Sequence, residues 1–212
     1  MTDCTLASLF ERYPALLPLR GDIERAVEMM IQCYRRGGKA LACGNGGSAA
    51  DAEHIVGELM KGFLRKRPIS AAFREKIEAC FPGEGAGICA SLQTPLTAIA
   101  LTSHVALSTA FNNDVNPEFT FAQQLLGLGR QGDVLIALST SGNSRNVVNA
   151  CKIAKVMGIE TIAMTGASGG ALKRMCDVTL CAPSSETFVI QEYHLPIYHA
   201  LCYLVEAGFF RE

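Results

Sequence analysis

The chain has 212 residues, of which 49% are hydrophobic and 18% are charged, and its formal net charge is −1 at pH 7. This length and apolar content suit one α/β domain with a large buried core. The near-neutral charge excludes the basic surface that neutralises nucleic-acid phosphates. We therefore expect a small molecule or another protein as partner, and no nucleic acid.

The nine cysteines form no C-x-x-C pair, and most of them lie within apolar runs. A reduced thiol in such a run packs as a small hydrophobic group, which favours a reducing compartment. The first residues, MTDCTLASLFERYP, lack the basic region and the apolar run of a signal peptide. We expect a cytoplasmic protein with no membrane span.

The first regular element in chain order is an amphipathic helix that begins near Asp22 and ends at RRGG. Its apolar side chains recur at helical spacing, at Ile23, Ala26, Val27, Met30, Ile31 and Tyr34. The short apolar run KALAC follows, then the glycine-rich turn GNGGS, then helical periodicity over 48–66. Strand, turn and helix together predict a β-loop-α unit.

The same pattern recurs along the rest of the chain. The apolar runs TAIAL, DVLIALS, ETIAMT and DVTLC precede the helical segments SHVALSTAF, NVVNACKIAKVMG, GGALKRM and the last helix. Five short strands that alternate with helices predict a doubly wound parallel sheet with helices on both faces. Ligands of such sheets bind at the carboxyl ends of the strands, where the loops after KALAC and DVLIAL lie.

Residues 67–96 interrupt this alternation between a helix and the next strand. The segment is too long for an ordinary connection, and we expect a short helix within it at 73–80. Two interpretations stay open. The segment covers an active site or mediates assembly, or it is a tolerated surface insertion.

The turn GNGGS at 44–48 is suited to bind an anion, because glycines let the main chain approach a ligand and a helix N-terminus follows. A simpler interpretation is helix capping, with Ser48 as N-cap and Asp51 completing a pair like a capping box. The glycine spacing matches neither dinucleotide nor P-loop motifs. We therefore expect no nucleotide cofactor.

A second loop, STSGNS at 139–144, also follows a buried strand and opens a helix. Its hydroxyl groups belong to Ser139, Thr140, Ser141 and Ser144. Hydroxyls and main-chain amides suit a phosphate monoester. Helix capping explains Ser144 but not the three hydroxyl residues before it, so the two loops together predict a phosphorylated ligand.

The motifs GNGGSAADAEH, STSGNS and IQEYHLPIYH together resemble the SIS (sugar isomerase) domain family, and within it the sedoheptulose 7-phosphate isomerases. The resemblance spans nearly the whole chain except 67–96. It implies a single SIS domain over 1–212, with a flavodoxin-like sheet and an N-terminal helix. It also implies a homotetramer with active sites between subunits.

The resemblance assigns Glu58 as the catalytic glutamate, which transfers the proton between C1 and C2, and His199 as the histidine that serves the sugar oxygens. A solvated helix glutamate and a core histidine are the simpler interpretations of these residues. Glu58 lies roughly 15 Å along its helix from Ser48. The loop at 139–144 therefore holds the phosphate, or two subunits share the site, or both.

Some family members bind zinc, and the corresponding residues here are His54, Glu58, Gln191 and His199. The substrate-binding residues that the loops and the resemblance indicate are Asn45, Gly46, Gly47, Ser48, Asn113, Asp114, Ser139, Thr140, Ser141, Ser144 and Gln191. Turn chemistry alone also explains the sequence NND at 112–114. Pro196 is expected to kink or delimit the helix that carries His199.

The resemblance predicts an isomerase that interconverts sedoheptulose 7-phosphate and D-glycero-D-manno-heptose 7-phosphate for nucleotide-heptose synthesis. One alternative is a non-catalytic SIS binding module, such as the replication regulator that contacts the initiator DnaA. Glu58 and His199 argue against it, because those relatives lack both groups. Another alternative is an isomerase of a different ketose or aldose phosphate, since residues 67–96 are placed to reshape the sugar pocket.

Overall fold

A five-stranded parallel sheet forms the centre of the computed structural model, which describes residues 6–210. The strand order is β2-β1-β3-β4-β5, and every neighbouring pair is parallel. The strands are β1 (Ala40–Cys43), β2 (Ala98–Ala100), β3 (Val134–Leu138), β4 (Glu160–Thr165) and β5 (Val178–Cys181). All five match the predicted apolar runs, and the order is the flavodoxin-like one.

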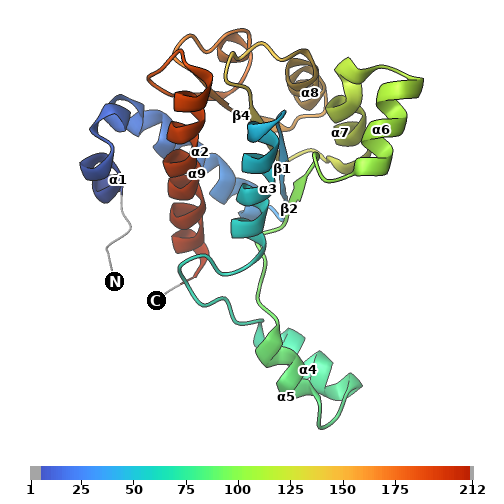
Figure 1. The fold of residues 1–212 in the computed structure, drawn as a ribbon. Coiled ribbons are helices and arrows are strands. Elements are labelled where there is room, and N and C mark those ends of the chain that lie inside the picture. The colour runs from blue at the N-terminus through green and yellow to red at the C-terminus, as the bar shows by residue number, and fades with distance from the viewer. Residues whose placement is uncertain (1–5, 211–212) are drawn as a thin grey trace.

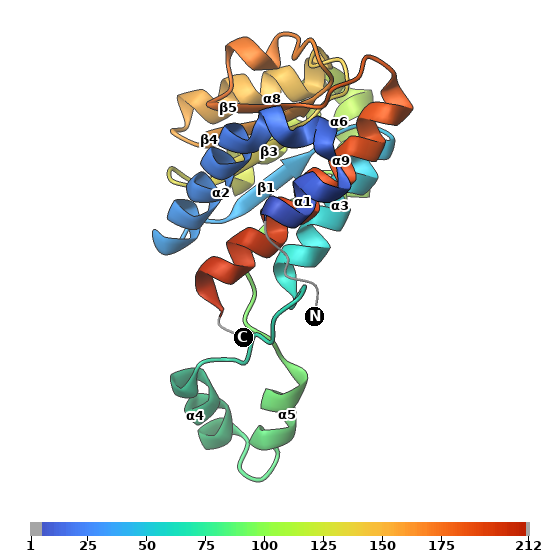
Figure 2. The same cartoon turned by 90° about the vertical axis from the view of Figure 1, so that its left-hand side faces the viewer.

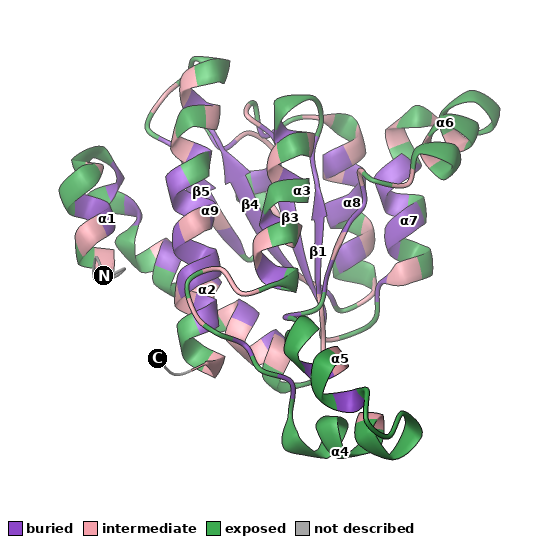
Figure 3. Ribbon diagram, turned by 60° about the horizontal axis from the view of Figure 1, so that its bottom comes forward, coloured by how far each residue is buried: buried purple, intermediate pink, exposed green. Residues whose placement is uncertain are grey.

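Helices cover both faces of the sheet because alternate strand residues point to opposite sides (Figures 1 and 3). Ala42 and Ile136 lie in one apolar core with side chains of α2 (Arg20–Arg35), α3 (Gly47–Met60) and α9 (Thr187–Phe209). Leu41 and Leu135 lie in the other, with α7 (Thr120–Leu128) and α8 (Arg145–Val156). The doubly wound α/β prediction is confirmed.

The remaining elements lie around these two layers. The first helix expected from the sequence, beginning near Asp22, is present as α2. The helix α1 (Leu6–Arg12) precedes it and was not predicted, and its Leu9 is fully buried in the core that α9 lines. The others are α6 (Val105–Asp114) and the 3-10 helices η1 (Pro14–Leu19), η2 (Pro117–Phe119) and η3 (Leu172–Arg174). No helix among residues 6–210 is long and apolar enough to cross a membrane.

Two sequence predictions of helix boundaries were wrong. The helix expected over 48–66 ends at Met60, because the next main-chain N–H groups turn to bind the Glu206 carboxylate. GGALKRM contributes only η3, since it opens with two glycines of low helix propensity. Pro196 was expected to kink or delimit its helix, and of these two alternatives the boundary is ruled out, because α9 continues past it. The carbonyl that Pro196 leaves without a helical donor belongs to exposed Glu192.

Residues 61–97 connect α3 to β2, and 71–91 within them form an arm that stands off from the body beyond the C-terminal end of α3 (Figures 1 and 2). The helix expected at 73–80 is present as α4 (Ala71–Cys80), and α5 (Gly85–Ser91) packs against it. Main-chain bonds from Thr94 to Arg67 and from Leu96 to Leu59 join the two ends of the arm at its base. The base of the arm is thus tied directly to the end of α3.

Candidate active site

The loops after β1 and β3 meet at the carboxyl edge of the sheet. The amide groups of Asn45 and Asn146 exchange two hydrogen bonds, of 2.9 and 2.8 Å. Because β1 and β3 are neighbours, their carboxyl ends lie side by side. The turn at 44–48 and the loop at 139–144 therefore border one surface. Asn146 was not singled out in the sequence.

The loop at 139–144 is held in shape by its own polar groups. Ser139 Oγ donates to Ser144 Oγ at 2.9 Å, and the Asn143 N–H donates to Ser141 Oγ at 3.1 Å. Ser139 is buried, Thr140 is half-buried and Ser141 is exposed. The hydroxyl residues of the loop thus range from buried to exposed, and Ser139, Ser141 and Ser144 take part in its internal hydrogen bonds.

The turn at 169–171 packs against the loop at 139–144. Gly142 has a φ of +66°, and a Cβ atom there would collide with the main-chain oxygen of Gly169. The Asn143 side chain also accepts a hydrogen bond of 2.9 Å from the Ala171 N–H. The conformation of 139–144 therefore depends on close main-chain contact with 169–171.

The helix α3 begins at Gly47, two residues earlier than it would if Ser48 were its N-cap. Gly46, with a φ of +56°, is the N-cap. Ser48 is buried in the first turn and makes no side-chain cap, so the capping-box interpretation is wrong. Gly47 lies against α9, since a Cβ atom there would be 2.5 Å from Gln191 Nε2. Gln191 thus borders the turn.

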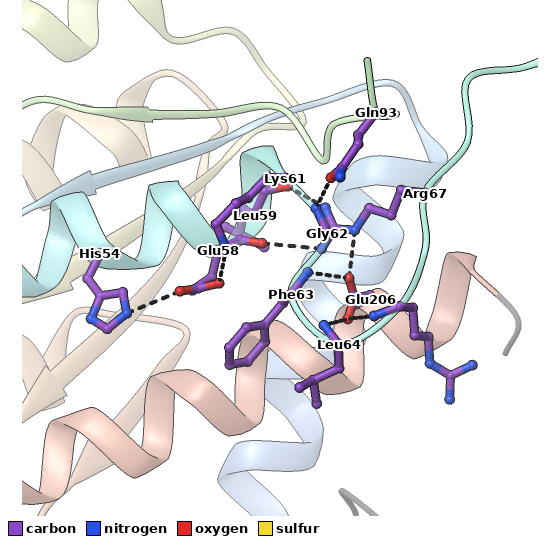
Figure 4. A network of polar contacts seen from close by, with 11 residues as sticks. His54, Glu58, Leu59, Lys61, Gly62, Phe63, Leu64, Arg67, Gln93 and Glu206 are labelled. Carbon is purple, nitrogen blue, oxygen red and sulfur yellow. Dashed lines mark hydrogen bonds and ion pairs between the residues drawn. The ribbon is translucent and has the colours of Figure 1, made fainter. Parts of the chain in front are cut away.

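A cluster of titratable side chains lies farther along the contact between α3 and α9. His54 Nε2 is 3.2 Å from Glu58 Oε1 (Figure 4), and Tyr198 Oη is hydrogen-bonded to His54 Nδ1 at 2.9 Å. The rings of His54 and His199 have centroids 5.1 Å apart. The structure thus brings together three residues of the predicted site and adds Tyr198, which the sequence analysis missed.

Lys61 controls the charge state of Glu58. Burial opposes ionisation of this carboxyl group, but the hydrogen bond and charge of Lys61, helped by His54, outweigh it and lower the pKa of Glu58. The Lys61 Nζ atom is 2.8 Å from Glu58 Oε2. The three-residue spacing on the chain is a signal that could have identified this pair.

His199 has a lowered pKa for a different reason. Burial disfavours its charged form, and the neighbouring His54 adds to this, while Glu58 acts in the opposite direction. Its Nε2 atom is buried with no hydrogen-bond partner. A neutral imidazole with one uncommitted nitrogen can accept or donate a proton at a bound molecule.

Other polar residues that the sequence offered lie outside this cluster or at its edge. Asn113 donates to Asp114 Oδ1 at 2.7 Å, and both are exposed at the end of α6, far from α9 (Figure 1). His194 is fully buried, and desolvation lowers its pKa to about 4. Asp51 is not a cap: burial raises its pKa, and Tyr198 Oη lies 3.4 Å from its Oδ1 atom.

Comparisons with known proteins identify the family of this chain. SIS domain families match residues 16–79 and 90–203. A phosphoheptose isomerase of Akkermansia muciniphila is 36% identical over 201 residues, covering 95% of this chain and 93% of the relative. The chain belongs to the phosphoheptose isomerase family. Residues 80–89 of the arm fall between the two SIS matches.

Solved structures of phosphoheptose isomerases share this fold. The isomerase GmhA from Neisseria gonorrhoeae has a TM-score of 0.74 at 36% identity, with 95% of this chain and 94% of that one covered. The phosphoheptose isomerase from Francisella tularensis has a TM-score of 0.75 at 33% identity, with 95% and 93% covered. The resemblance stated from the motifs is thereby confirmed, and so is the SIS fold.

The structure brings together three of the four residues expected to bind zinc, His54, Glu58 and His199. The fourth, Gln191, lies beside Gly47 at the turn. Within residues 6–210, no group of three or more His, Cys, Asp or Glu side chains is arranged to hold a metal ion. His54 and Lys61 engage the two Glu58 oxygens. A metal ion would have to replace these contacts.

Substitution of Gly142 by alanine tests the rigidity of the SIS loop at 139–144. We expect Gly142→Ala to destabilise the protein by about 2 kcal/mol or more, because of its positive φ and the collision with Gly169. Gly57→Ala is the control, since its φ is not positive and no atom lies within 4 Å of its added Cβ. We expect it to stabilise α3 by up to ~1 kcal/mol. Urea unfolding measures both, and equal effects would contradict the prediction.

Proposed function

We propose that this chain is a phosphoheptose isomerase that interconverts sedoheptulose 7-phosphate and D-glycero-D-manno-heptose 7-phosphate, and so supplies nucleotide-heptose synthesis. The observation that carries the proposal is the contact of His54, Glu58 and His199 between α3 and α9 in a member of this family. A carboxylate and a neutral imidazole are the groups that an aldose–ketose isomerisation needs.

In the proposed reaction, Glu58 removes a proton from C1 of the open-chain ketose, and an enediol forms. Glu58 then returns the proton to C2, which gives the aldose. His199 moves protons between the two sugar oxygens and assists ring opening. Its Nε2 atom, buried and without a partner, is the group available for this transfer.

The two loops hold the ends of the substrate in this proposal. Hydroxyl groups and main-chain amides at 139–144 bind the phosphate, through Ser139, Thr140, Ser141 and Ser144. The sugar hydroxyls contact the carboxyl-edge turn and the side chain beside it, at Asn45, Gly46, Gly47, Ser48 and Gln191. Asn113 and Asp114 lie far from α9 within one chain, so in this proposal they contact the sugar from another subunit. The bonds between Asn45 and Asn146 support a common binding surface for both ends.

We further propose that the active enzyme is a cytoplasmic homotetramer whose subunits share each site, as the motifs imply. The roughly 15 Å between Ser48 and Glu58 along α3 supports sharing. The cysteines at 33, 43, 80, 89, 151, 176, 181 and 202 are all unpaired, which supports a reducing compartment. Light scattering of the purified chain measures the assembly, and a fully active monomer would contradict the tetramer.

The roles proposed for Glu58 and His199 predict that substituting either residue greatly lowers activity while the protein still folds. We expect Glu58→Gln and His199→Ala each to lower kcat by about 10²–10⁴-fold, because each removes a proton-transfer group. Activity is measured on a panel of ketose and aldose phosphates, with sedoheptulose 7-phosphate expected to react fastest. Faster turnover of a pentose or hexose phosphate would reassign the substrate. Binding of phosphosugars without any turnover would favour the non-catalytic SIS module.

The contact between Lys61 and Glu58 predicts how the activity depends on pH. Because Lys61 favours the ionised form of Glu58, Lys61→Met raises the pKa of that carboxyl group. The acid limb of kcat/KM, where Glu58 loses its charge, therefore moves to higher pH. Lys66→Met serves as the control, since this exposed lysine is not among the groups that shift Glu58. The same shift in both variants would show a general charge effect.

We also propose that zinc binds to His54, Glu58, Gln191 and His199, where it would polarise the substrate oxygens as a Lewis acid. The proximity of His54 to both Glu58 and His199 supports this site. Elemental analysis of the purified protein is expected to find about one zinc ion per chain, and much less in His54→Ala. Retention of zinc by that variant would exclude His54 as a ligand, and full activity without metal would exclude a required zinc.

A further inference from the structure

We infer that Arg67 and Glu206 are positioning residues for Glu58, an inference that rests on the proposed isomerase activity. The two side chains form an ion pair with 2.7 Å between Arg67 Nε and Glu206 Oε1 (Figure 4). Both side chains are completely buried. Neither lies in the motifs that indicate the site, and neither is available to touch substrate.

The Glu206 carboxylate determines where α3 stops. Besides Arg67, it accepts hydrogen bonds from the main-chain N–H groups of Phe63, Leu64 and Arg65, at 2.8, 2.8 and 3.1 Å. Four donors thus converge on one buried carboxylate, which leaves little of its acceptor capacity unused. The chain directly after α3 is thereby bound to α9.

The Arg67 guanidinium group completes the connection to Glu58. It donates to the carbonyl oxygen of Leu59 at 2.6 Å and to that of Glu58 at 3.2 Å. Carbonyls in the last turn of a helix have no partners within the helix, so Arg67 caps the end of α3 at the Glu58 main chain. Its planar shape allows it to bond both carbonyls and Glu206 at once.

The Arg67–Glu206 ion pair also connects Glu58 to the helix that carries His199. Glu206 lies seven residues after His199 on α9, and a seven-residue spacing places both on one face of a helix. One end of this connection is therefore the helix of His199, and the other is the main chain of Glu58. Displacement of reacting groups by ~1 Å can cost about 100-fold in rate. A buried ion pair is weak support for stability alone, so geometry is the role we assign to it.

Two conservative variants test this inference. Glu206→Gln keeps the size and one acceptor oxygen but removes the charge that holds Arg67. Arg67→Lys keeps the charge but cannot reach both carbonyls. We expect each to lower kcat at least ~10-fold with KM for sedoheptulose 7-phosphate changed less than ~2-fold, measured well below the unfolding temperature. If Glu206→Gln does not fold, Arg67→Lys decides.

Asp133→Asn is the matched control for loss of a buried ion pair. Asp133 is 2.6 Å from Lys39 Nζ and accepts main-chain bonds from Lys39 and Arg130, at the start of β3 and away from Glu58. We expect its unfolding temperature to fall while kcat per folded molecule stays at the wild-type value. Wild-type kcat in Arg67→Lys, or an equal loss of kcat in Asp133→Asn, would overturn the positioning role. A wild-type chain without isomerase activity would instead overturn the proposed function.

Discussion

Packing of α3 on α9 is the interaction on which the site depends. Ala52, Ile55 and Leu59 of α3 are buried in the same core as Ile197 and Leu201 of α9, so hydrophobic burial sets the contact. His54, Glu58 and His199 lie at the margin of this contact, where they are only partly shielded from water. The apolar residues thus determine the distance between the titratable groups, whose own attraction is too weak to do so.

The parallel sheet imposes a second constraint. It collects the turn at 44–48 and the loop at 139–144 at one edge, because parallel strands end on the same side. Glu58, however, lies in the last turn of α3, which runs away from that edge (Figure 1). Within one chain, the loops proposed to bind the phosphate therefore lie apart from the groups proposed to transfer protons. This separation is the physical basis for proposing that subunits share each site.

The sequence predicted those parts of the structure that follow from local pattern. Apolar runs located all five strands, and glycine-rich turns located the two loops. The end of α3 at Met60 could not be predicted, because its cause is Glu206, some 140 residues away in the chain. Tyr198 was missed for a similar reason: its bond to His54 exists only after α3 and α9 pack. The Glu58–Lys61 pair was local and could have been found.

The electrostatics of Glu58 show why the pair with Lys61 does not prevent proton abstraction. Burial alone would raise the pKa of this carboxyl group, and Lys61 reverses that effect. The Lys61 side chain is 60% exposed, so water and salt screen its attraction, and little energy is lost when it moves. A sugar that covers the cluster removes water from Glu58 and competes with Lys61 for its oxygens. In the proposed reaction, Glu58 therefore becomes a stronger base when substrate is bound.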